Sequence, residues 1–528
     1  MFKKIINNNF SRSLLSAVLL WLAWSPNGYC WLIFIAFIPL LQIEFELSNQ
    51  KFEKTYSKFL GYAYLTMLIW NLLTTWWVAY ASLEGSLLAF LMNSLLMAFV
   101  LQFFHITHKK TNHVIGYASL VCYWLAFEYL HLNWDMSWPW LTLGNAFAEG
   151  YKYVQWYEYV GTQGGSLWVL VINILIFYWL FISEQKKKLS TIIVLLITIP
   201  AIASLTIYYN YQEKVNPTNI IVTQPNIDPY NEKFSGTMNT EQLMRCINVS
   251  AGLIDDKTDF WVAPETAIAL DLWENEIDST EEILMLREFI SAHPKMTLLL
   301  GSSTAKEYDT EATSTARENK NNHKFYDSFN SAIQIEKNTS TQIYHKSKLV
   351  PGVEIIPFPG IMKYFEKYAI NLGGTSGSLG IQKERTAFKN KNNPVVAAPI
   401  ICYESVYSEY VSEYVRNGAN ILFIVTNDGW WDDTPGYKQH LAYARLRAIE
   451  NRRSIARSAN TGISAFYNQR GDILQQSEWW KPMALKQTLN INNDETMFTK
   501  LGDFIYKMAV LLSLGLLGLI LLKKFKRN

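Results

Sequence analysis

The sequence has few cysteines and little net charge, and both shortages exclude classes of function. Its four cysteines, Cys30, Cys122, Cys246 and Cys402, show no Cys-x-x-Cys spacing, so neither a zinc site nor a disulfide framework is indicated. We therefore expect no metal and no cofactor. The net charge is only +2, which offers no argument for nucleic-acid binding. A cleaved signal peptide is not expected either, because the first apolar stretch continues into further ones.

Long apolar stretches, by contrast, are abundant and lie toward the two ends of the chain. They cover about eight segments, roughly 13–25, 30–46, 59–81, 86–105, 115–134, 164–183, 190–209 and 504–522. Several of them are long enough to cross ~30 Å of hydrocarbon as helices. The sequence therefore predicts a polytopic α-helical membrane domain over residues 1–209. It also predicts a C-terminal transmembrane helix with a basic tail over residues 504–528.

The lysines between these stretches predict how the chain crosses the membrane. Lys54 and Lys58 lie between the second and third stretches, and Lys186, Lys187 and Lys188 follow the sixth. The alternate short loops, 25–29 and 82–86, carry no lysine or arginine. Because lysine and arginine concentrate in cytoplasmic loops, both termini are expected in the cytoplasm. In a bacterial inner membrane, residues 210–503 would then face the periplasm.

Residues 210–503 alternate strand-like and helix-like patterns, which predicts an α/β sheet domain. The polar stretch 307–324 is expected to be a solvent-exposed loop. Strands are expected at 219–225, 259–264, 296–301, 330–337, 341–346, 395–402, 419–426 and 461–467, and helices at 241–254, 279–293 and 437–452.

Three of these strands end at a chemically reactive side chain. Glu265 follows one strand, Lys346 ends another and Cys402 ends the apolar run 395–402. Strand ends on one edge of an α/β sheet are where ligands bind. A carboxylate that takes the thiol proton, a cation that stabilises an oxyanion and a thiol together form an acyl-transfer site. Taken singly, the three have plainer explanations: an acid at a helix start, a solvated lysine and a buried cysteine.

Four motifs in this domain carry a resemblance to a known family. They are Pro264-Glu-Thr266, Tyr344-His-Lys346, Ile401-Cys-Tyr-Glu404 and Thr426-Asn-Asp-Gly-Trp430. The set resembles the carbon–nitrogen hydrolase (nitrilase) superfamily. With apolar spans on both sides of the domain, the whole chain is similar to the apolipoprotein N-acyltransferase family of bacterial inner membranes. The resemblance implies an α-β-β-α sandwich with a Glu–Lys–Cys triad. It also implies transfer of an acyl chain from a membrane phospholipid to the N-terminal amine of diacylglyceryl-cysteine in an apolipoprotein, through a Cys thioester.

The resemblance assigns the catalytic roles residue by residue. Cys402 would be the nucleophile, Glu265 the general base and Lys346 the group that stabilises the tetrahedral intermediate. Glu354 would be a second acid that lines the site. Lys346 is chosen over the nearby Lys348 because it completes the Tyr-x-Lys pattern.

Three further residues are expected to support the reaction. Tyr403 and Glu404 follow the nucleophile as in the family, with the Tyr403 N–H as a donor to the oxyanion. Trp430 would line the path of the acyl chain. The chain departs from the family at Pro351-Gly-Val-Glu354, where many relatives have Pro-Phe-Gly-Glu. This departure keeps Glu354 in register but changes the loop that carries it.

Two other functions fit part of the pattern, and one segment allows two interpretations. The chain could be a membrane-anchored amidase that gives the acyl group of a periplasmic amide to water, although seven spans exceed what an anchor needs. It could also be a transporter or scaffold, although the spans carry few ionisable residues to mark an ion path. The apolar stretch 355–365 is either a mobile lid or membrane-dipping arm, or ordinary packing on the sandwich.

Overall fold

The computed structural model describes residues 8–50, 54–234, 238–355, 378–391 and 393–525. The chain divides into two units, one formed by Met1–Asn210 with Leu501–Asn528 and the other by Tyr211–Lys500. We call them the helical unit and the sandwich unit. The apolar stretch 355–365, expected to be a lid or packed core, lies outside the described residues except for Ile355.

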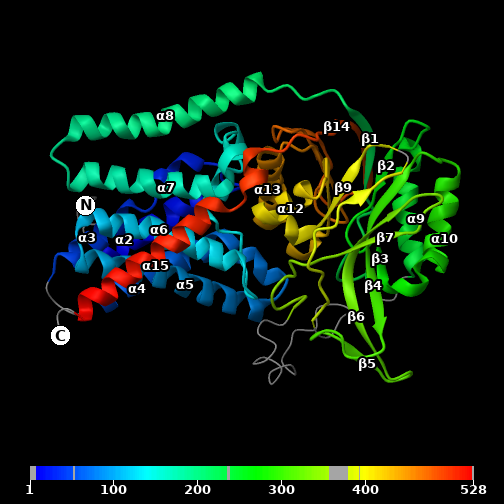
Figure 1. Ribbon diagram of the computed structural model, residues 1–528, viewed down its shortest axis with the longest axis horizontal. Coiled ribbons are helices and arrows are strands. Elements are labelled where there is room, and N and C mark those ends of the chain that lie inside the picture. The colour runs from blue at the N-terminus through cyan, green and yellow to red at the C-terminus, as the bar shows by residue number, and fades with distance from the viewer. Residues whose placement is uncertain (1–7, 51–53, 235–237, 356–377, 392, 526–528) are drawn as a thin grey trace. The chain divides into compact units, whose positions relative to one another are not determined.

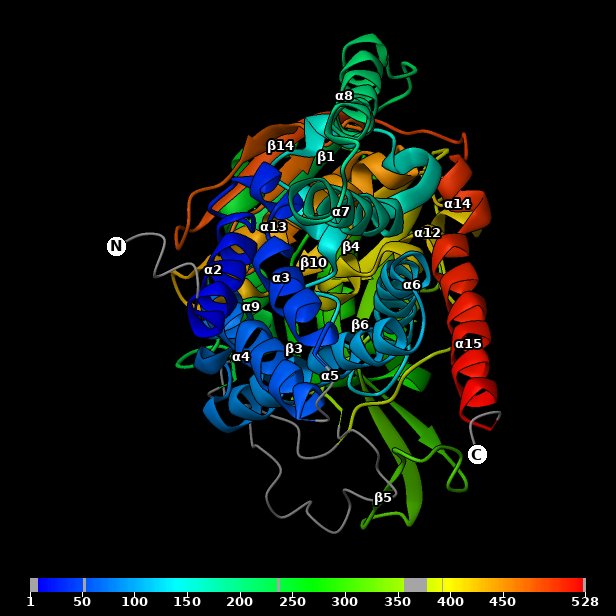
Figure 2. The ribbon, with the colours of Figure 1, turned by 90° about the vertical axis from the view of Figure 1, so that its left-hand side faces the viewer.

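The helical unit is a bundle of long helices (Figures 1 and 2). Its main helices are α2 (Asn9–Leu22), α3 (Ile38–Ser48), α4 (Thr55–Thr75), α5 (Leu83–Lys110), α6 (His113–Leu132), α7 (Tyr157–Phe181), α8 (Lys186–Asn210) and α15 (Phe504–Phe525). Side chains cap the starts of α2, α5 and α6: Asn8 accepts from the Phe10 N–H at 3.0 Å, Ser82 from the Gly85 N–H at 3.1 Å and Asn112 from the Ile115 N–H at 2.9 Å. Local sequence thus sets where these three helices begin.

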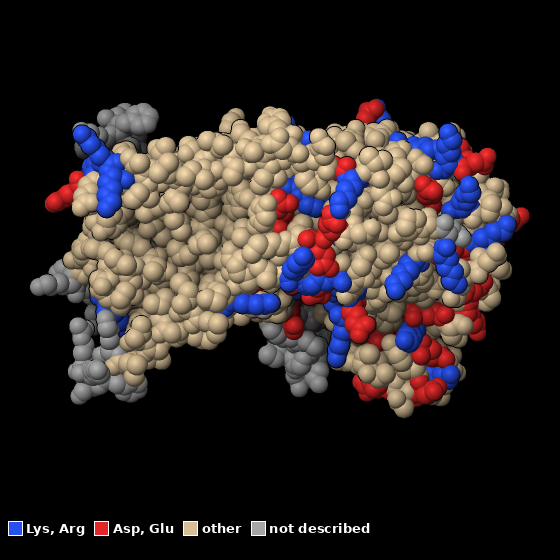
Figure 3. Space-filling view, turned by 45° about the horizontal axis from the view of Figure 1, so that its top comes forward, with Lys and Arg blue, Asp and Glu red and all other residues tan. Residues whose placement is uncertain are grey.

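Five helical segments of the described chain are long and apolar enough to cross a membrane. They are Cys30–Ser48, Gly85–Lys110, Tyr157–Phe181, Lys186–Asn210 and Phe504–Leu522. Each overlaps one of the stretches expected from the sequence. The other three expected stretches are helical as well, but α2 is only 14 residues long, and α4 and α6 carry buried polar side chains such as Asn71 and Glu128. The surface agrees with this apolar character, because a broad area of the helical unit in Figure 3 shows no Lys, Arg, Asp or Glu side chains.

The described part of the sandwich unit contains two β-sheets. The eight-stranded sheet has the order β14-β1-β2-β4-β6-β5, with β3 paired to β4 and β7 to β6, and the six-stranded sheet has the order β13-β12-β11-β10-β9-β8. The strands of the first sheet are β1 (Pro217–Gln224), β2 (Phe260–Val262), β3 (Ile268–Trp273), β4 (Thr297–Tyr308), β5 (Arg317–Asn319), β6 (Lys324–Ile335), β7 (Gln342–His345) and β14 (Met483–Asn490). Those of the second are β8 (Phe388–Lys389), β9 (Val396–Ile401), β10 (Ile421–Thr426), β11 (Ile455–Ala459), β12 (Ala465–Tyr467) and β13 (Ile473–Gln476).

The two sheets pack against each other, and helices cover their outer faces (Figure 1). Between the sheets, the rings of Phe260 on β2 and Phe423 on β10 lie 5.1 Å apart. On the first sheet, α9 (Asn239–Ser250) and α10 (Glu281–Ser291) bury an apolar face against Trp261 and Leu298. On the second, α12 (Ser408–Arg416) and α13 (Pro435–Asn451) pack beside β9 and the turn that follows it. The predicted α-β-β-α sandwich is confirmed.

Strand direction explains why the candidate residues meet. β2 runs parallel to β4, β4 is antiparallel to β6, and β6 is antiparallel to β7, so β2 and β7 end at the same edge of their sheet. Glu265 follows β2 and Lys346 follows β7. The expected strands and helices are present with shifted ends, but the expected loop 307–324 contains β5 and the end of β4. That region pairs through its backbone with β6, which its polar side chains do not reveal.

Candidate active site

Cys402 lies where β9 turns sharply into a short 3-10 helix, Cys402–Val406. Its φ of 48° is in the left-handed region, which costs a non-glycine residue on the order of 1–3 kcal/mol. Two hydrogen bonds hold the turn: the Glu404 carboxylate accepts from the Ile401 N–H at 2.9 Å, and Ser405 Oγ donates to the Cys402 carbonyl at 2.7 Å. The thiol is therefore presented from a fixed backbone.

Glu265 occupies a tight turn after β2 that only a glycine on β4 accommodates. A Cβ atom at Gly301 would lie 2.5 Å from the Glu265 Cα, so a side chain there would force the turn away. The buried carboxylate accepts from Asn330 Nδ2 at 2.8 Å and from Lys346 Nζ at 3.0 Å. Its backbone carbonyl accepts from Lys233 Nζ at 3.1 Å. Both the backbone and the side chain of the acid are held in place.

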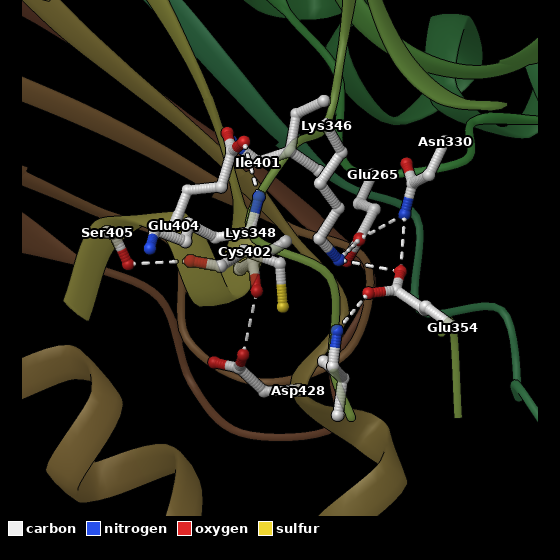
Figure 4. A network of polar contacts seen from close by, with 12 residues as sticks. Glu265, Asn330, Lys346, Lys348, Glu354, Ile401, Cys402, Glu404, Ser405 and Asp428 are labelled. Atoms are coloured by element: carbon white, nitrogen blue, oxygen red, sulfur yellow. Dashed lines mark hydrogen bonds and ion pairs between the residues drawn. The ribbon is translucent and has the colours of Figure 1, made fainter. Parts of the chain in front are cut away.

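Lys346 joins two carboxylates into one network, which Figure 4 shows. Its Nζ donates to Glu265 at 3.0 Å and to Glu354 at 2.7 Å, and Asn330 Nδ2 donates to the same two acids at 2.8 and 3.0 Å. Burial opposes the charged form of this lysine, but the two carboxylates hold the pKa of Lys346 well above its ordinary value. The site thus contains an ammonium that stays charged in a place from which water is largely excluded.

The electrostatic surroundings keep Cys402 protonated at rest. Its pKa is raised, first by burial and then by the negative charge of Glu265, while Lys346 acts in the opposite direction. In Figure 4 the Lys346 amine is drawn beside Cys402, and its charge acts on the sulfur. Because a thiol is a weak nucleophile, an attack by this sulfur would require a base, and Glu265 is the carboxylate whose charge acts most strongly on the sulfur.

Glu404 connects the turn at Cys402 to the residues around Lys346. The fully buried carboxylate accepts from the Tyr344 hydroxyl at 2.7 Å, the Tyr410 hydroxyl at 2.6 Å and the Ser347 N–H at 2.8 Å, besides the Ile401 N–H. One side chain therefore connects the end of β7 with the end of β9. Glu404 positions Lys346 relative to Cys402.

The remaining expected residues lie at the margin of this network. Tyr403 is buried directly after the nucleophile. The ring of Trp430 lies 5.1 Å from that of Tyr230 and 6.1 Å from that of Phe234, so an aromatic cluster surrounds it. The Lys348 ammonium lies 4.7 Å from the centre of the Tyr407 ring, whereas Lys346 joins the two acids, as its place in the motif suggested.

Sequence reasoning missed two residues of the site. Asn330 is the amide that bridges both acids, and its only signal was a polar residue at the start of the expected strand 330–337. Lys233 lies in the loop after β1, where nothing in the local pattern suggested that its ammonium is buried. Burial lowers the pKa of Lys233 to about 8, although Cys246 and Glu265 favour the charged form. Among the residues that the structure describes, no group of three or more histidine, cysteine, aspartate or glutamate side chains could hold a metal ion.

Two protein families match the chain. The apolipoprotein N-acyltransferase N-terminal domain matches residues 16–175, and the carbon–nitrogen hydrolase family matches residues 224–492. The first match covers most of the helical unit, and the second contains all of the candidate site residues.

Several curated proteins are similar over most of this length. The apolipoprotein N-acyltransferase of Chlorobaculum tepidum is 29% identical over 98% of this chain and 97% of that protein. The enzyme of the same name from Rickettsia bellii is 27% identical over 82% of this chain and 81% of that protein. Among solved structures, Saccharomyces cerevisiae Nit3, a member of branch 10 of the nitrilase superfamily, is 14% identical and has a TM-score of 0.34. That match covers 52% of this chain and 90% of Nit3.

Proposed function

The chain belongs to the carbon–nitrogen hydrolase family, and we propose that its Cys402 carries an acyl chain as a thioester from a membrane phospholipid to a lipoprotein amine. The chain is an acyltransferase of lipoprotein N-acylation, as both family matches and its full-length relatives indicate. The acceptor is the N-terminal amine of diacylglyceryl-cysteine in an apolipoprotein. The geometry supports a role for each site residue in two half-reactions.

The first half-reaction forms the thioester. Glu265 takes the proton of the Cys402 thiol while the sulfur attacks the ester carbonyl of the phospholipid. The negative charge on the carbonyl oxygen is stabilised by the Lys346 ammonium and by the Tyr403 N–H. When the ester C–O bond breaks, Glu265 returns the proton to the departing oxygen. A lysophospholipid leaves, and the acyl chain remains on Cys402.

The second half-reaction reverses these roles with an amine as the nucleophile. Glu265 accepts a proton from the N-terminal amine as its nitrogen attacks the thioester carbonyl. The same cation and N–H stabilise the second oxyanion. The C–S bond breaks, the sulfur regains its proton from Glu265, and an amide is left on the lipoprotein. Glu354 keeps Lys346 charged through both steps, and Trp430 with its aromatic neighbours lines the path of the acyl chain.

The single observation that carries this proposal is the position of Lys346. Its buried ammonium is shared between Glu265 and Glu354 at 3.0 and 2.7 Å, beside a cysteine whose pKa is raised. A charged group so well paired supplies a fixed positive potential for an oxyanion and needs no reorganisation during the reaction. This arrangement serves acyl transfer to an amine and hydrolysis alike, so the amidase alternative differs in its acyl donor, a periplasmic amide, and in its second nucleophile, water.

The membrane arrangement is a further part of the proposal. Residues 1–209 would cross a bacterial inner membrane seven times, residues 504–528 would cross it once more, and residues 210–503 would act in the periplasm. The lysines in alternate loops and the five apolar helices support this topology. Reporter fusions after Lys188 should report cytoplasm and fusions near residue 310 should report periplasm. A cytoplasmic signal at 310 would contradict it.

One experiment separates acyl transfer from hydrolysis. The purified full-length chain is given a phospholipid with a labelled acyl chain, with and without a peptide whose N-terminal cysteine carries diacylglycerol. We expect the label on the peptide amine when the peptide is present, and only slow release of free fatty acid without it. Rapid release of fatty acid that the peptide does not divert would favour the amidase.

A further inference from the structure

A second buried cluster lies behind Cys402, on the side of its backbone carbonyl. It consists of Asp428 after β10, His440 on α13 and Arg457 on β11, all with 0% exposure, together with Ser405. Arg457 forms an ion pair with Asp428. The mechanism proposed above uses none of these side chains. Charged groups are buried at a cost, so a fully buried ion pair beside a reactive residue calls for an explanation.

His440 connects this cluster to the nucleophile. Its Nε2 lies 2.8 Å from Ser405 Oγ and 3.2 Å from the Cys402 carbonyl oxygen. Its Nδ1 lies 3.0 Å from Asp428 Oδ1 and 3.2 Å from Arg457 Nη2. Burial and the charge of Arg457 lower the pKa of His440. The Cys402 carbonyl can only accept a hydrogen bond, so its contact requires the ring proton on Nε2, and Arg457 Nη2 then donates to Nδ1 as well as to Asp428. His440 and Ser405 therefore both direct hydrogen bonds at the same carbonyl.

The order Ser405–His440–Asp428 has the contacts of a serine-hydrolase triad, but it does not form a second nucleophilic site. Ser405 is 2% exposed, and its hydroxyl donates to a backbone carbonyl. A substrate carbonyl cannot approach an oxygen that is buried in this way. The cluster must therefore act through Cys402.

Peptide geometry shows how it acts. The peptide bond between Cys402 and Tyr403 is planar, and in a trans peptide the carbonyl and the following N–H point in opposite directions. Holding the Cys402 carbonyl from one side thus fixes the direction of the Tyr403 N–H on the other. These hydrogen bonds to the carbonyl matter because Cys402 has a φ of 48°, an unfavourable conformation that the backbone would otherwise tend to leave.

We propose that His440, held by Asp428 and Arg457, is a positioning residue that fixes the Cys402–Tyr403 peptide so that the Tyr403 N–H meets the oxyanion. The inference rests on the proposed function, because it is the acyl transfer that creates an oxyanion. It assigns the cluster to one part of the reaction, the stabilisation of charge on the substrate oxygen. Within the cluster, the charge of Asp428 acts on the Cys402 thiol, less strongly than the charges of Glu265 and Lys346, and substitutions at His440 or Ser405 leave Asp428 in place.

Two reactions of Cys402 distinguish this role from general support of the fold. Thioester formation from phospholipid passes through an oxyanion, whereas alkylation by iodoacetamide does not. In His440→Leu, the rate of thioester formation should fall roughly a hundredfold, as expected when an oxyanion donor is displaced, while the KM for phospholipid is unchanged. Alkylation of Cys402, read by peptide mass spectrometry, should stay within about threefold of the wild type.

Three variants complete the test. Ser405→Ala removes the other donor to the Cys402 carbonyl. It should slow thioester formation by roughly tenfold and leave the rate of alkylation unchanged. His440→Gln can still donate to Ser405 and the carbonyl, so it should recover part of the rate. Tyr467→Phe is the matched control, since it removes a buried hydrogen bond of 2.9 Å to Leu441 on the same helix, and both reactions should keep wild-type rates.

Each outcome decides for or against the inference. An equal loss of acylation and alkylation in His440→Leu or in Ser405→Ala would overturn it, because the cluster would then support the thiol or the fold. If His440→Leu does not fold, the comparison of the two rates in Ser405→Ala decides. A wild-type protein that alkylates at Cys402 but never forms a thioester would remove the proposed function, and this inference with it.

Discussion

Each unit of the molecule buries a carboxylate, and the two carboxylates are held in different ways. Glu128 on α6 of the helical unit accepts from Trp124 Nε1 at 3.1 Å, the Leu143 N–H at 2.8 Å and the Tyr506 hydroxyl at 2.8 Å. All three donors are neutral. They come from α6 itself, from the 3-10 helix Leu143–Phe147 and from α15, so this acid ties three segments of its unit together.

Glu265 of the sandwich unit is held by a cation that it shares with a second acid. Lys346 lies between it and Glu354, and Asn330 bridges the same two carboxylates. Charge on this acid acts on a neighbouring thiol, whereas neutral donors hold Glu128 among apolar helices. The comparison teaches that burial alone does not identify a catalytic acid. What distinguishes Glu265 is a cation that it shares with another acid and a reactive thiol on which its charge acts.

The largest effect should come from removing the shared cation. Lys346→Met leaves Glu265 and Glu354 buried without a positive charge between them, which is unfavourable by about 3–5 kcal/mol. We expect no thioester from phospholipid and a clear loss of stability in denaturant unfolding. Lys348→Met is the matched control and should keep most of the activity. The reverse pattern, with Lys348 essential and Lys346 dispensable, would mean that the wrong lysine has been assigned.

The next effect should come from neutralising the base while keeping its shape. Glu265→Gln should slow thioester formation by roughly a hundredfold or more, as the loss of a general base does. Glu354→Gln leaves the Glu265 carboxylate in place and should slow thioester formation less. Quenched-flow measurement of lysophospholipid release compares the two. If Glu354→Gln were the slower variant, the two acids would exchange roles.

A third carboxylate, Asp428, sharpens the comparison because a cation, Arg457, pairs with it although the proposed reaction does not use its proton. Burial opposes its ionised form, but Arg457 and His440 outweigh burial and lower the pKa of Asp428 to about 2 from an ordinary 3.8. Because the pKa of Asp428 is lower in the folded than in the unfolded protein, its ionised carboxylate stabilises the fold at pH values above the unfolded-state pKa. This stabilisation is lost as the pH falls through the folded-state pKa. The window is therefore about pH 4 to 2, and the size is on the order of 2 kcal/mol.

Asp428→Asn should remove this part of the acid destabilisation. Unfolding free energies of the full-length chain, measured between about pH 5 and 2, should converge for variant and wild type toward low pH. A gap between the two that stays constant over this range would contradict the assignment of the low pKa to Asp428.

The smallest effect is expected at Glu128 of the helical unit. Glu128→Gln keeps an oxygen that accepts hydrogen bonds, so acyl transfer should stay within about threefold of the wild type. Glu128→Leu leaves the three donors unsatisfied, and thermal unfolding should show a loss of about 1–3 kcal/mol for each donor that finds no new partner. Loss of acyl transfer in a folded Glu128→Gln would mean that this acid has a chemical role.

The sequence predicted much of the fold, because strands and helices of the sandwich core carry strong apolar patterns. It failed where that pattern is interrupted. β11 was missed because Arg457 and Ser458 break its apolar run, yet both are fully buried, the arginine because Asp428 pairs with it. β14 was missed because polar and apolar side chains alternate only weakly along it. The strand is half-buried and pairs with β1.

In the site too, residues with a local sequence signal could be predicted and residues without one could not. Glu265, Lys346 and Cys402 each end a strand, so a local pattern pointed to them. Asn330 and His440 act through partners 65 and 38 residues away along the chain, Glu265 and Cys402. No local pattern records such contacts, which exist only after the strands and α13 have packed. That the eight apolar stretches all cross the membrane stays a prediction.

The most direct test of the account is the mass of the peptide that contains Cys402 after the protein has met phospholipid alone. We predict that this peptide gains one acyl chain, that neutral hydroxylamine removes it, and that one lysophospholipid appears for each adduct. The adduct should persist until a diacylglyceryl-cysteine amine is added, and Cys402→Ala should give none. Release of lysophospholipid by Cys402→Ala at the wild-type rate would contradict the covalent mechanism.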